Sequence, residues 1–413
     1  MPLGLLASLL GACRTSEPRD TIRFWAFGRE GEVVQELVRG FERDHPGVRI
    51  RVQQIPWSAA HEKLLTAIVG RSTPDVAQMG NTWIPEMVTL GAIAPLAITL
   101  ADSSYFPGIL ATNVVEDSLY GLPWYVDTRV LFYRKDILAR AGYRSMPEDW
   151  AGWRLAMQAI KRTAPAGQYA IFLPLNEWPP MAIFGLQAGS PLVTAEGRGA
   201  FRDSAFTRAF DFLLGLYRDG LAAPVSSNEI ANLYQEFSRG TFAMYISGPW
   251  NLGEFRRRIP AELQATWGTA ALPGPTGSRS GVSLAGGSSL VVFRSSPHQA
   301  LANQLVEYLS RPEQQARFYR LTGDLPARRE AWADSVLARD READAFRIQL
   351  ERAVPTPMLP EWEEVTTKLM DHIEVAVRGG GTAAAALAAL DGDVDRLLER
   401  RRYLKSRRTG AAP

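Results

Sequence analysis

The sequence predicts an α/β protein made of two units, and three observations support this. The chain has 413 residues, more than one hydrophobic core usually serves, so two domains are expected. Hydrophobic residues make up 46% and charged residues 22%, as in folded proteins. From residue 21 onward, strand-like apolar runs alternate with helical runs at a short period. That alternation is typical of parallel sheets with right-handed crossovers.

The first unit contains three predicted strands, in TIRFWAF, RIRVQQI and PDVAQM (21–27, 49–55 and 74–79). A helix follows each strand, in 32–48, 59–70 and 83–93. Val33, Leu37 and Phe41 recur at helical spacing in the first helix, and Pro46-Gly47 ends it. Ligands of such sheets bind beyond the carboxyl ends of the strands. This rule selects two expected loops, GREGE (28–32) and GNTW (80–83).

The second unit is predicted from about Val130 to Ala271. Its elements include helices near 148–162 and 204–219 and a strand in TFAMYIS (241–247). Beyond it, GVSLAGGSSLVVF (281–293) has strand character and one helix is expected over 299–323. After Pro360 the chain is predicted to be helical through Leu398, with an interruption at RGGGT (378–382). The segment GLPWYVDTRVLFYRKD (121–136) lies where the first unit passes into the second.

Charge and histidine spacing exclude several classes of function. Lys and Arg number 46 and Asp and Glu 44, so no nucleic-acid partner is expected. The basic run Arg396–Arg408 is interpreted as a solvated helix end and not as a binding arm. The four histidines fall in four separate elements, so no metal site is expected. No nucleotide-binding glycine motif is present, and no cofactor is expected.

The first residues resemble the signal segment of a bacterial lipoprotein. LLGAC ends an uncharged apolar run at Cys13, the only cysteine of the chain. Residues 1–13 are therefore predicted to be a signal peptide, with Cys13 as the lipidated residue and 14–20 as a polar tether. An ordinary signal segment with a chance cysteine is the alternative. Eight apolar residues are too few to span a bilayer, which takes about 20, so the prediction is an extracytoplasmic protein anchored to the membrane by lipid alone.

Seven segments, in the same order, closely resemble the family-1 extracellular solute-binding proteins of sugar ABC transporters, those for maltose and trehalose above all. They are 46–57, 61–87, 90–96, 120–136, 240–250, 285–292 and 322–328. The resemblance runs from Thr21 to about Leu398. It implies a type II periplasmic-binding-protein fold: two α/β lobes joined by crossing strands, a ligand cleft between them and no catalysis. The implied division is 21–127 plus 283–329 for the N-lobe, 128–282 plus 330–402 for the C-lobe and 403–413 for a basic tail.

The resemblance also implies a set of ligand-binding residues. A sugar offers an apolar face to aromatic rings and hydroxyl groups to carboxylate, amide and guanidinium groups. By position, the implied residues are Glu32, Asn81 and Trp83 from the N-lobe, Tyr125 and Asp127 from the crossing strand, Trp178 and Trp250 from the C-lobe, Gly286 and Gly287 at a close backbone approach, and Arg328 from the last crossover.

Some of these residues have structural alternatives. Trp83 could belong to the core, Trp178 could brace the loop beside Pro179-Pro180, and Glu32 could only complement a helix dipole. Asn81 stands where some relatives have Asp, and GGSS lacks an aromatic that some relatives have there, so the particular sugar stays open. The remaining tryptophans assigned to packing or surface are Trp57, Trp153, Trp267, Trp332 and Trp362.

The predicted function is a monomeric, lipid-anchored protein that binds a mono- or oligosaccharide and delivers it to an ABC permease. One alternative is a lipid-anchored glycosidase or lyase, because a glycosidase needs only two suitably spaced carboxylates. Its candidates are Glu32, Asp75, Asp127 and Glu177. The other alternative is a binding protein for another polar solute, such as a glycerol-phosphate diester. The arginines available for such a ligand are Arg29, Arg129 and Arg328.

Overall fold

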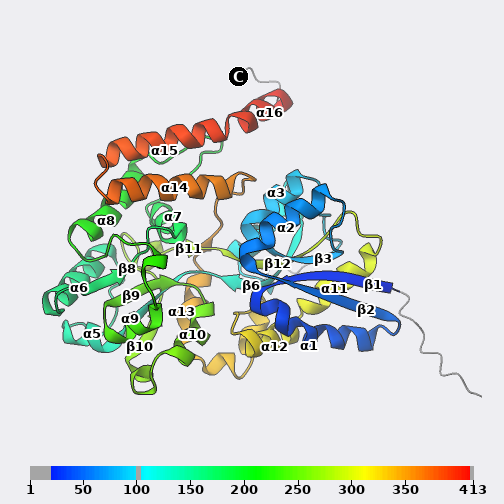
Figure 1. Ribbon diagram of the computed structural model, residues 1–413, viewed down its shortest axis with the longest axis horizontal. Helices are drawn as coiled ribbons and strands as arrows, with labels where there is room; N and C mark the ends of the chain where they lie inside the picture. The colour runs from blue at the N-terminus through cyan, green and yellow to red at the C-terminus, as the bar shows by residue number, and fades with distance from the viewer. Residues whose placement is uncertain (1–19, 99–103, 410–413) are drawn as a thin grey trace, which may run out of the picture.

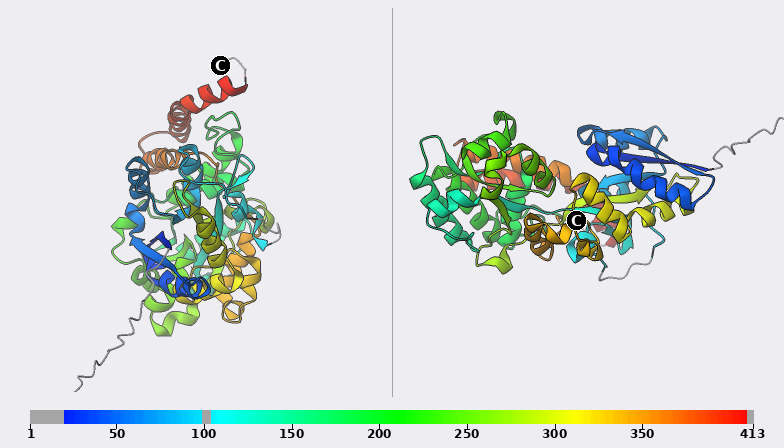
Figure 2. Two further views of the ribbon diagram at one scale, coloured as in Figure 1. Left: turned by 90° about the vertical axis from the view of Figure 1, so that its right-hand side faces the viewer. Right: turned by 90° about the horizontal axis from the view of Figure 1, so that it is seen from below.

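The computed structural model describes residues 20–98 and 104–409. Its strands form two main sheets, each packed with its own helices, and the two bodies lie side by side (Figure 1). The view from below separates them and shows strands running from one to the other (Figure 2).

The first sheet has five strands in the order β2-β1-β3-β12-β6. They are Val48–Ile55, Asp20–Phe27, Val76–Gly80, Gly286–Val292 and Gly121–Asp127. The sheet is parallel from β2 to β3, as predicted, but β12 runs antiparallel to both β3 and β6. The parallel prediction concerned only these first three strands. Strand β12 joins the sheet antiparallel, because it returns from the second body and not through a strand–helix–strand crossover.

Helices cover this sheet on both faces, and most begin and end close to the predicted positions. They are α1 Gly28–Asp44, α2 Trp57–Val69, α3 Ile84–Thr89, α4 Pro107–Ala111, α11 Gln299–Leu309 and α12 Pro312–Thr322. Two expectations were wrong. Residues 28–32 form the first turn of α1 and not a loop, and the single helix expected over 299–323 is broken, because Pro312 starts a new helix after Arg311.

The second sheet has four strands in the order β10-β7-β9-β8: Trp267–Ala270, Val130–Arg134, Phe242–Ser247 and Tyr169–Phe172. Its helices are α5 Lys135–Arg140, α6 Trp150–Thr163, α7 Trp178–Gln187, α8 Ser204–Arg218, α9 Leu233–Arg239, α10 Trp250–Arg258 and α13 Arg341–Leu350. After it come α14 Trp362–Val377, α15 Ala383–Leu397 and α16 Glu399–Thr409, which lie along the top in Figure 1. The basic run is therefore helical, as predicted.

The chain passes between the two bodies beside a small sheet. Strand β6 ends at Asp127 in the first sheet, and β7 begins at Val130 in the second, with two residues between them. Next to this crossing, β11 (Ser283–Leu284) pairs in parallel with β13 (Ala353–Val354). Ser283 is buried, and its hydroxyl group accepts from the backbone N–H of Arg129 at 3.0 Å and donates to the carbonyl of Arg129 at 2.9 Å. The crossing segments are thereby tied to one another.

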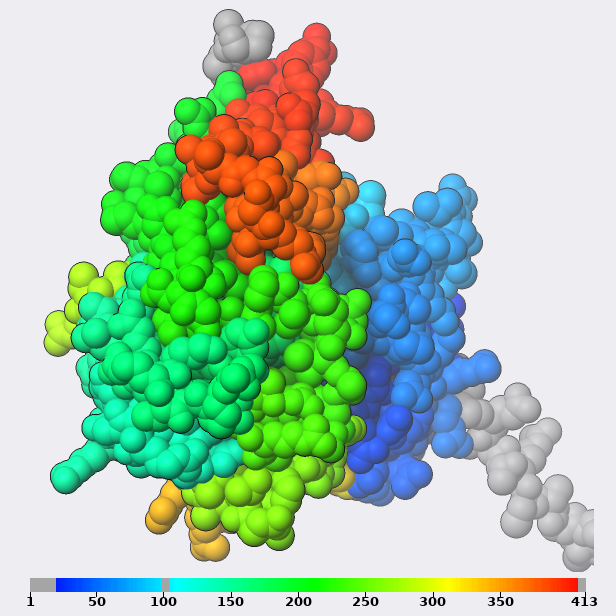
Figure 3. All heavy atoms as spheres, turned by 60° about the vertical axis from the view of Figure 1, so that its left-hand side comes forward, coloured from blue at the N-terminus to red at the C-terminus, as the bar shows by residue number. Residues whose placement is uncertain are grey.

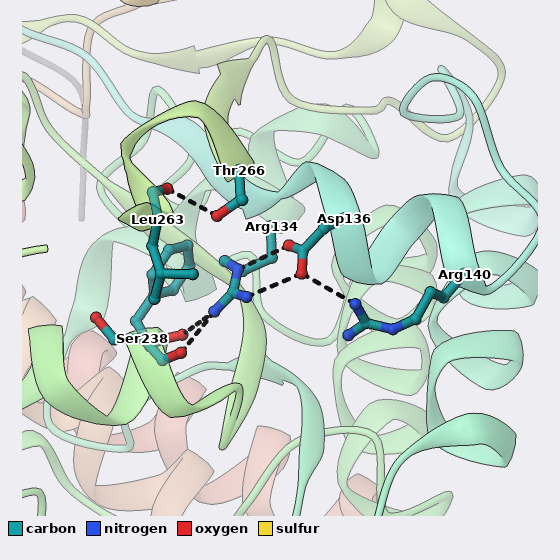
Figure 4. Close-up of polar contacts among 7 residues, drawn as sticks. Arg134, Asp136, Arg140, Ser238, Leu263 and Thr266 are labelled. Carbon is teal, nitrogen blue, oxygen red and sulfur yellow. Dashed lines mark hydrogen bonds and ion pairs between the residues drawn. The ribbon is translucent and has the colours of Figure 1, made fainter. Parts of the chain in front are cut away.

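A buried arginine fixes the end of β7 within the second body (Figure 4). The guanidinium group of Arg134 donates to both carboxylate oxygens of Asp136, at 2.8 and 2.9 Å, and to the carbonyls of Phe237 and Ser238. Arg140 donates to the same carboxylate at 3.0 Å. These contacts leave Arg134 fully engaged at 6% exposure, so it stabilises the fold and not a site.

Residues 20–98 and 104–409 include no helix that is long and apolar enough to cross a bilayer. They contain no group of three or more His, Cys, Asp or Glu placed to hold a metal ion. Cys13, the signal peptide over 1–13 and most of the predicted tether lie outside the described residues.

Candidate functional site

A cavity of about 610 Å³ opens between the two bodies. The strand crossing lines its floor, and the two sheets and their helices line its walls. The structure brings eight of the ten predicted residues to it: Asn81, Trp83, Tyr125, Asp127, Trp178, Trp250, Gly286 and Gly287. Glu32 and Arg328 are not among the lining residues.

The carboxylate that reaches the cavity from α1 belongs to Glu30 and not to Glu32. Glu30 is 6% exposed, and it accepts hydrogen bonds from the phenol of Tyr125 at 2.7 Å and the indole of Trp57 at 3.2 Å. Burial raises its pKa, and these hydrogen bonds act in the opposite direction. Residues two apart on a helix point about 200° apart, so Glu32 faces away, where it pairs with Arg29 at 2.7 Å.

Aromatic rings form the first wall beside Glu30. The rings of Trp57 and Trp83 meet edge to face at 5.8 Å, and Phe27 packs edge-on against Trp57 at 5.1 Å. Trp57, assigned to packing on sequence, lines the cavity as well. Its position directly after β2 is the signal that could have identified it, because it follows the carboxyl end of a parallel strand.

The side chain of Asn81 forms hydrogen bonds with other side chains of the protein. It is 3% exposed, its amide N–H donates to Thr112 at 2.7 Å, and its amide oxygen accepts from Ser289 at 2.9 Å. These bonds tie the turn after β3 to β12 and to α4. Asn81 therefore shapes the wall through its backbone position, and any bond from its amide to a ligand would add to these two.

An ion pair lies on the floor of the cavity, at the strand crossing. Asp127 and Arg129 approach to 3.2 Å, and the guanidinium group of Arg129 lies 4.5 Å from the ring centre of Trp250. Burial raises the pKa of Asp127, and the charge of Arg129 opposes this rise. The carboxylate of Asp127 is therefore a hydrogen-bond acceptor held in place by Arg129. The guanidinium group of Arg129 in turn contacts the ring of Trp250.

Glycine is required where β12 approaches β6. Gly287 has φ of +128°, and a Cβ at this position would lie 2.3 Å from the carbonyl oxygen of Tyr125. No side chain fits in that space, and few residues adopt that conformation. Glycine therefore allows β12 to approach β6 closely at the floor of the cavity, beside Tyr125 and Asp127.

Two tryptophans stand on the second wall, each at the first position of a helix. Trp178 begins α7 and packs edge-on against Trp362 at 5.7 Å. Trp250 begins α10 directly after β9 and Gly248-Pro249, and it is 42% exposed. A Cβ on Gly248 would collide with the ring of Trp250, so glycine allows the ring to fold back over the turn.

A second buried carboxylate lines the cavity near Glu30. Asp324 is 8% exposed, and burial together with the neighbouring charge of Glu30 raises its pKa to about 8. The pair therefore offers both a proton donor and acceptors to hydroxyl groups near neutral pH. Asp324 was not predicted from the sequence, because it does not follow the end of a recognisable strand, where ligand-binding residues were expected.

Arg328 lies outside the cavity. Its guanidinium group is 5.1 Å from the ring centre of Tyr105 and 3.6 Å from the carboxylate of Glu330. The arginines that line the cavity are Arg29, Arg129 and Arg257, and each has a carboxylate partner, respectively Glu32, Asp127 and Glu254. Of the four carboxylates considered for a glycosidase, Asp127 alone is a lining residue.

The cavity thus combines the faces of aromatic rings with charged side chains. Such a site can stack flat apolar faces and hydrogen-bond to several hydroxyl groups at once. Among the described residues that line the cavity, each arginine has a carboxylate partner, so no pair of cations is free to neutralise a phosphate.

Comparison with known proteins places this chain in a family. The family model for the bacterial extracellular solute-binding proteins matches residues 27–316. The sugar-binding protein MalE from Xanthomonas citri is 46% identical, with a TM-score of 0.90 over 94% of this chain and 99% of that one. The galactooligosaccharide-binding protein of Bacillus subtilis is 25% identical over 91% of this chain and 89% of its own length. The diacetylchitobiose-binding protein DasA of Streptomyces coelicolor is 24% identical, over 85% and 83%.

These likenesses confirm the predicted two-lobed α/β fold, since the match to the MalE structure covers 94% of this chain with a TM-score of 0.90. The chain belongs to the family of bacterial extracellular solute-binding proteins.

Proposed function

We propose that this protein binds a mono- or oligosaccharide in the cavity between its lobes and delivers it to the permease of an ABC importer. One observation carries the proposal: four tryptophans and Tyr125 line a cavity whose three arginines each pair with a carboxylate and whose wall also carries the buried carboxyl groups of Glu30 and Asp324. Sugar-binding sites need that combination, because rings cover the apolar face while charged groups take the hydroxyl groups. The named relatives for galactooligosaccharide and diacetylchitobiose support it.

The proposed ligand-binding residues are Glu30, Trp57 and Asp324 together with the eight predicted residues that line the cavity. Arg328 and Glu32 are not included, because neither reaches it. The proposed lobes are 21–127 plus 283–329 and 128–282 plus 330–402, which keeps each of the two main sheets within one lobe.

The protein acts, in this proposal, as a binding protein and not as an enzyme, and a lipid on Cys13 holds it at the extracytoplasmic face of a membrane. A curated relative, 25% identical and named as a lipoprotein, agrees with the anchor. A thermal-shift screen of mono-, di- and trisaccharides tests the binding. A ligand present at about 100 times its dissociation constant stabilises the folded state by about 2.7 kcal/mol.

The expected result is a large shift with a narrow set of sugars and none with glycerol-phosphate diesters. A shift with the phosphodiester alone would overturn the proposal. So would release of smaller sugars by the purified protein, since that is catalysis.

A further inference from the structure

A hydrogen bond links the two walls of the cavity. The hydroxyl group of Thr82 donates to the carboxylate of Glu363 at 2.7 Å, although the residues are 281 positions apart. Thr82 lies in the short 3-10 helix Asn81–Trp83 that follows β3, and it lines the cavity. Glu363 lies in the first turn of α14. Figure 1 shows α14 extending above the second body toward α2 and α3.

The first turn of α14 is anchored in the second body. Trp362, which precedes Glu363, is 1% exposed and belongs to the core formed with α7, α8 and α15. Its ring supports the cavity residue Trp178 at 5.7 Å. A movement of α14 relative to Thr82 is therefore a movement of the Trp178 wall relative to the Trp83 wall. Figure 3 shows the orange atoms of this region meeting the blue atoms of the first body.

Charged groups surround the contact. His61 of α2 bonds to Glu86 of α3 at 2.6 Å, and its ring lies 5.0 Å from that of Trp83. The pKa of His61 is raised by Glu86 first, then by Glu363 across the gap and by Glu62 on its own helix. Burial and the charges of Glu86, Glu361 and Glu363 raise the pKa of Glu364, and His61 lowers it. One imidazole therefore faces carboxylates of both bodies.

We propose that the bond between Thr82 and Glu363 is a clasp that holds the two walls of the cavity together, so that Glu363 is a positioning residue for ligand retention. The part that concerns ligand rests on the proposed sugar-binding function. The part that concerns the walls does not, because the bond joins two residues of the protein itself.

The walls' separation can be measured directly without a ligand. Spin labels are placed at Val69 and Leu155, which are exposed at the surface of the first and second bodies, in a background with Cys13→Ser. Thr82→Val and Glu363→Ala remove the donor and the acceptor, and each should shift the distance distribution to longer values. Thr82→Ser and Glu363→Gln keep a donor and an acceptor oxygen, so both should retain the wild-type distribution.

Two matched controls lie away from the contact, one in α3, which follows Thr82 in the chain, and one in α14. The hydroxyl of Thr89 bonds to its own helix at Pro85, and Glu374 pairs with Arg378 on α14. Thr89→Val and Glu374→Gln should leave the distances unchanged. Identical distributions for Thr82→Val, Glu363→Ala and wild type would overturn the clasp. A shift equally present in the controls would do the same.

Ligand retention provides the second measurement, with maltose as the test sugar. Loss of the clasp should speed maltose dissociation by about tenfold, as for a hydrogen bond to a charged group, and leave the association rate nearly unchanged. In the double variant, Thr82→Val with Glu363→Ala, the effect should equal that of either single variant. Failure of wild type to bind any sugar counts against the proposed function alone, since the label distances still decide the clasp.

The pH dependence adds an independent readout. Protonated His61 is favoured when Glu363 is near, so protonation stabilises the clasped arrangement, and this contribution is lost as pH rises through the raised pKa of His61. The wild-type distances should lengthen toward alkaline pH, and those of His61→Gln should not. A wild-type response that His61→Gln retains would remove the imidazole from the mechanism.

Discussion

Tyr125 donates a hydrogen bond of 2.7 Å to the carboxylate of Glu30, and the two residues are 95 positions apart in the chain. The phenol also accepts from the amide of Gln78 at 3.2 Å, so a polar group of β3, a ring of β6 and the first turn of α1 meet at one point. This contact fixes the orientation of the Glu30 carboxylate at the cavity. Substitutions at Tyr125 therefore test whether that orientation matters for binding.

Tyr125→Phe should weaken sugar binding by about 1 to 2 kcal/mol, because Glu30 loses one hydrogen bond that orients it and stays buried. Isothermal titration calorimetry with the best sugar of the screen measures it. Glu32→Gln is the matched control, since Glu32 faces solvent and should leave affinity unchanged. Equal losses in the two variants would mean that Glu30 is not the acceptor.

Trp250→Ala should weaken binding by about 2 kcal/mol or more, the threshold used for residues that dominate an interface. The variant removes an exposed ring from the cavity wall and the partner of Arg129 at the same time. Trp332→Phe serves as the control, because Trp332 bonds to the carbonyl of Pro326 and is not a lining residue. Calorimetry that gives both variants wild-type affinity would remove Trp250 from the site.

Stability should fall as pH rises between about 4 and about 8, through Asp324. Its folded-state pKa of about 8 lies above the ordinary carboxyl value of 3.8, so the folded protein binds the proton more tightly than the unfolded chain. The contribution is complete below the ordinary value and is lost as pH rises through the raised one. Asp324→Asn should flatten this part of the pH profile in urea unfolding without sugar. An unchanged slope would mean that Asp324 is already charged when folded.

Gly287→Ala should destabilise the fold by more than about 1 kcal/mol and lower affinity as well. The new Cβ meets the carbonyl of Tyr125 at 2.3 Å, at a φ that L-residues rarely adopt. Gly253→Ala is a useful comparison, because open space surrounds its Cβ position inside α10, where alanine favours the helix. Thermal unfolding of both variants should therefore change in opposite directions.

Cys13→Ser should abolish lipid attachment, because Cys13 is the only thiol in the chain. Mass spectrometry of the protein from the membrane fraction measures the lipid, and detergent partitioning measures the anchor. Both signals should disappear in the variant, whereas Ser16→Ala in the predicted tether should keep them. Persisting lipid mass in Cys13→Ser would place the modification elsewhere.

Local pattern predicted the elements of this protein better than it predicted its side-chain partners. The strands near 21–27, 49–55 and 241–247 follow from apolar runs between breakers, and the crossing at 121–136 follows from where the two units meet. Glu30 could not be chosen over Glu32 without knowing that residues 28–32 are helical. In a helix the two side chains point in nearly opposite directions, so only one of them faces the cavity. The partners of Asn81 could not be predicted either, since Thr112 and Ser289 are distant in sequence.

The place of β12 in the first sheet has a consequence for synthesis and folding. This strand lies between β3 and β6, yet it comes more than 200 residues after β3 pairs with β1. A nascent chain therefore cannot complete its first sheet until residue 292 is available, and an N-terminal fragment would leave the edges of β3 and β6 unpaired and prone to associate. Such distant pairings also slow folding. For the extracytoplasmic location proposed above, this late completion of the sheet favours export of the chain before it folds.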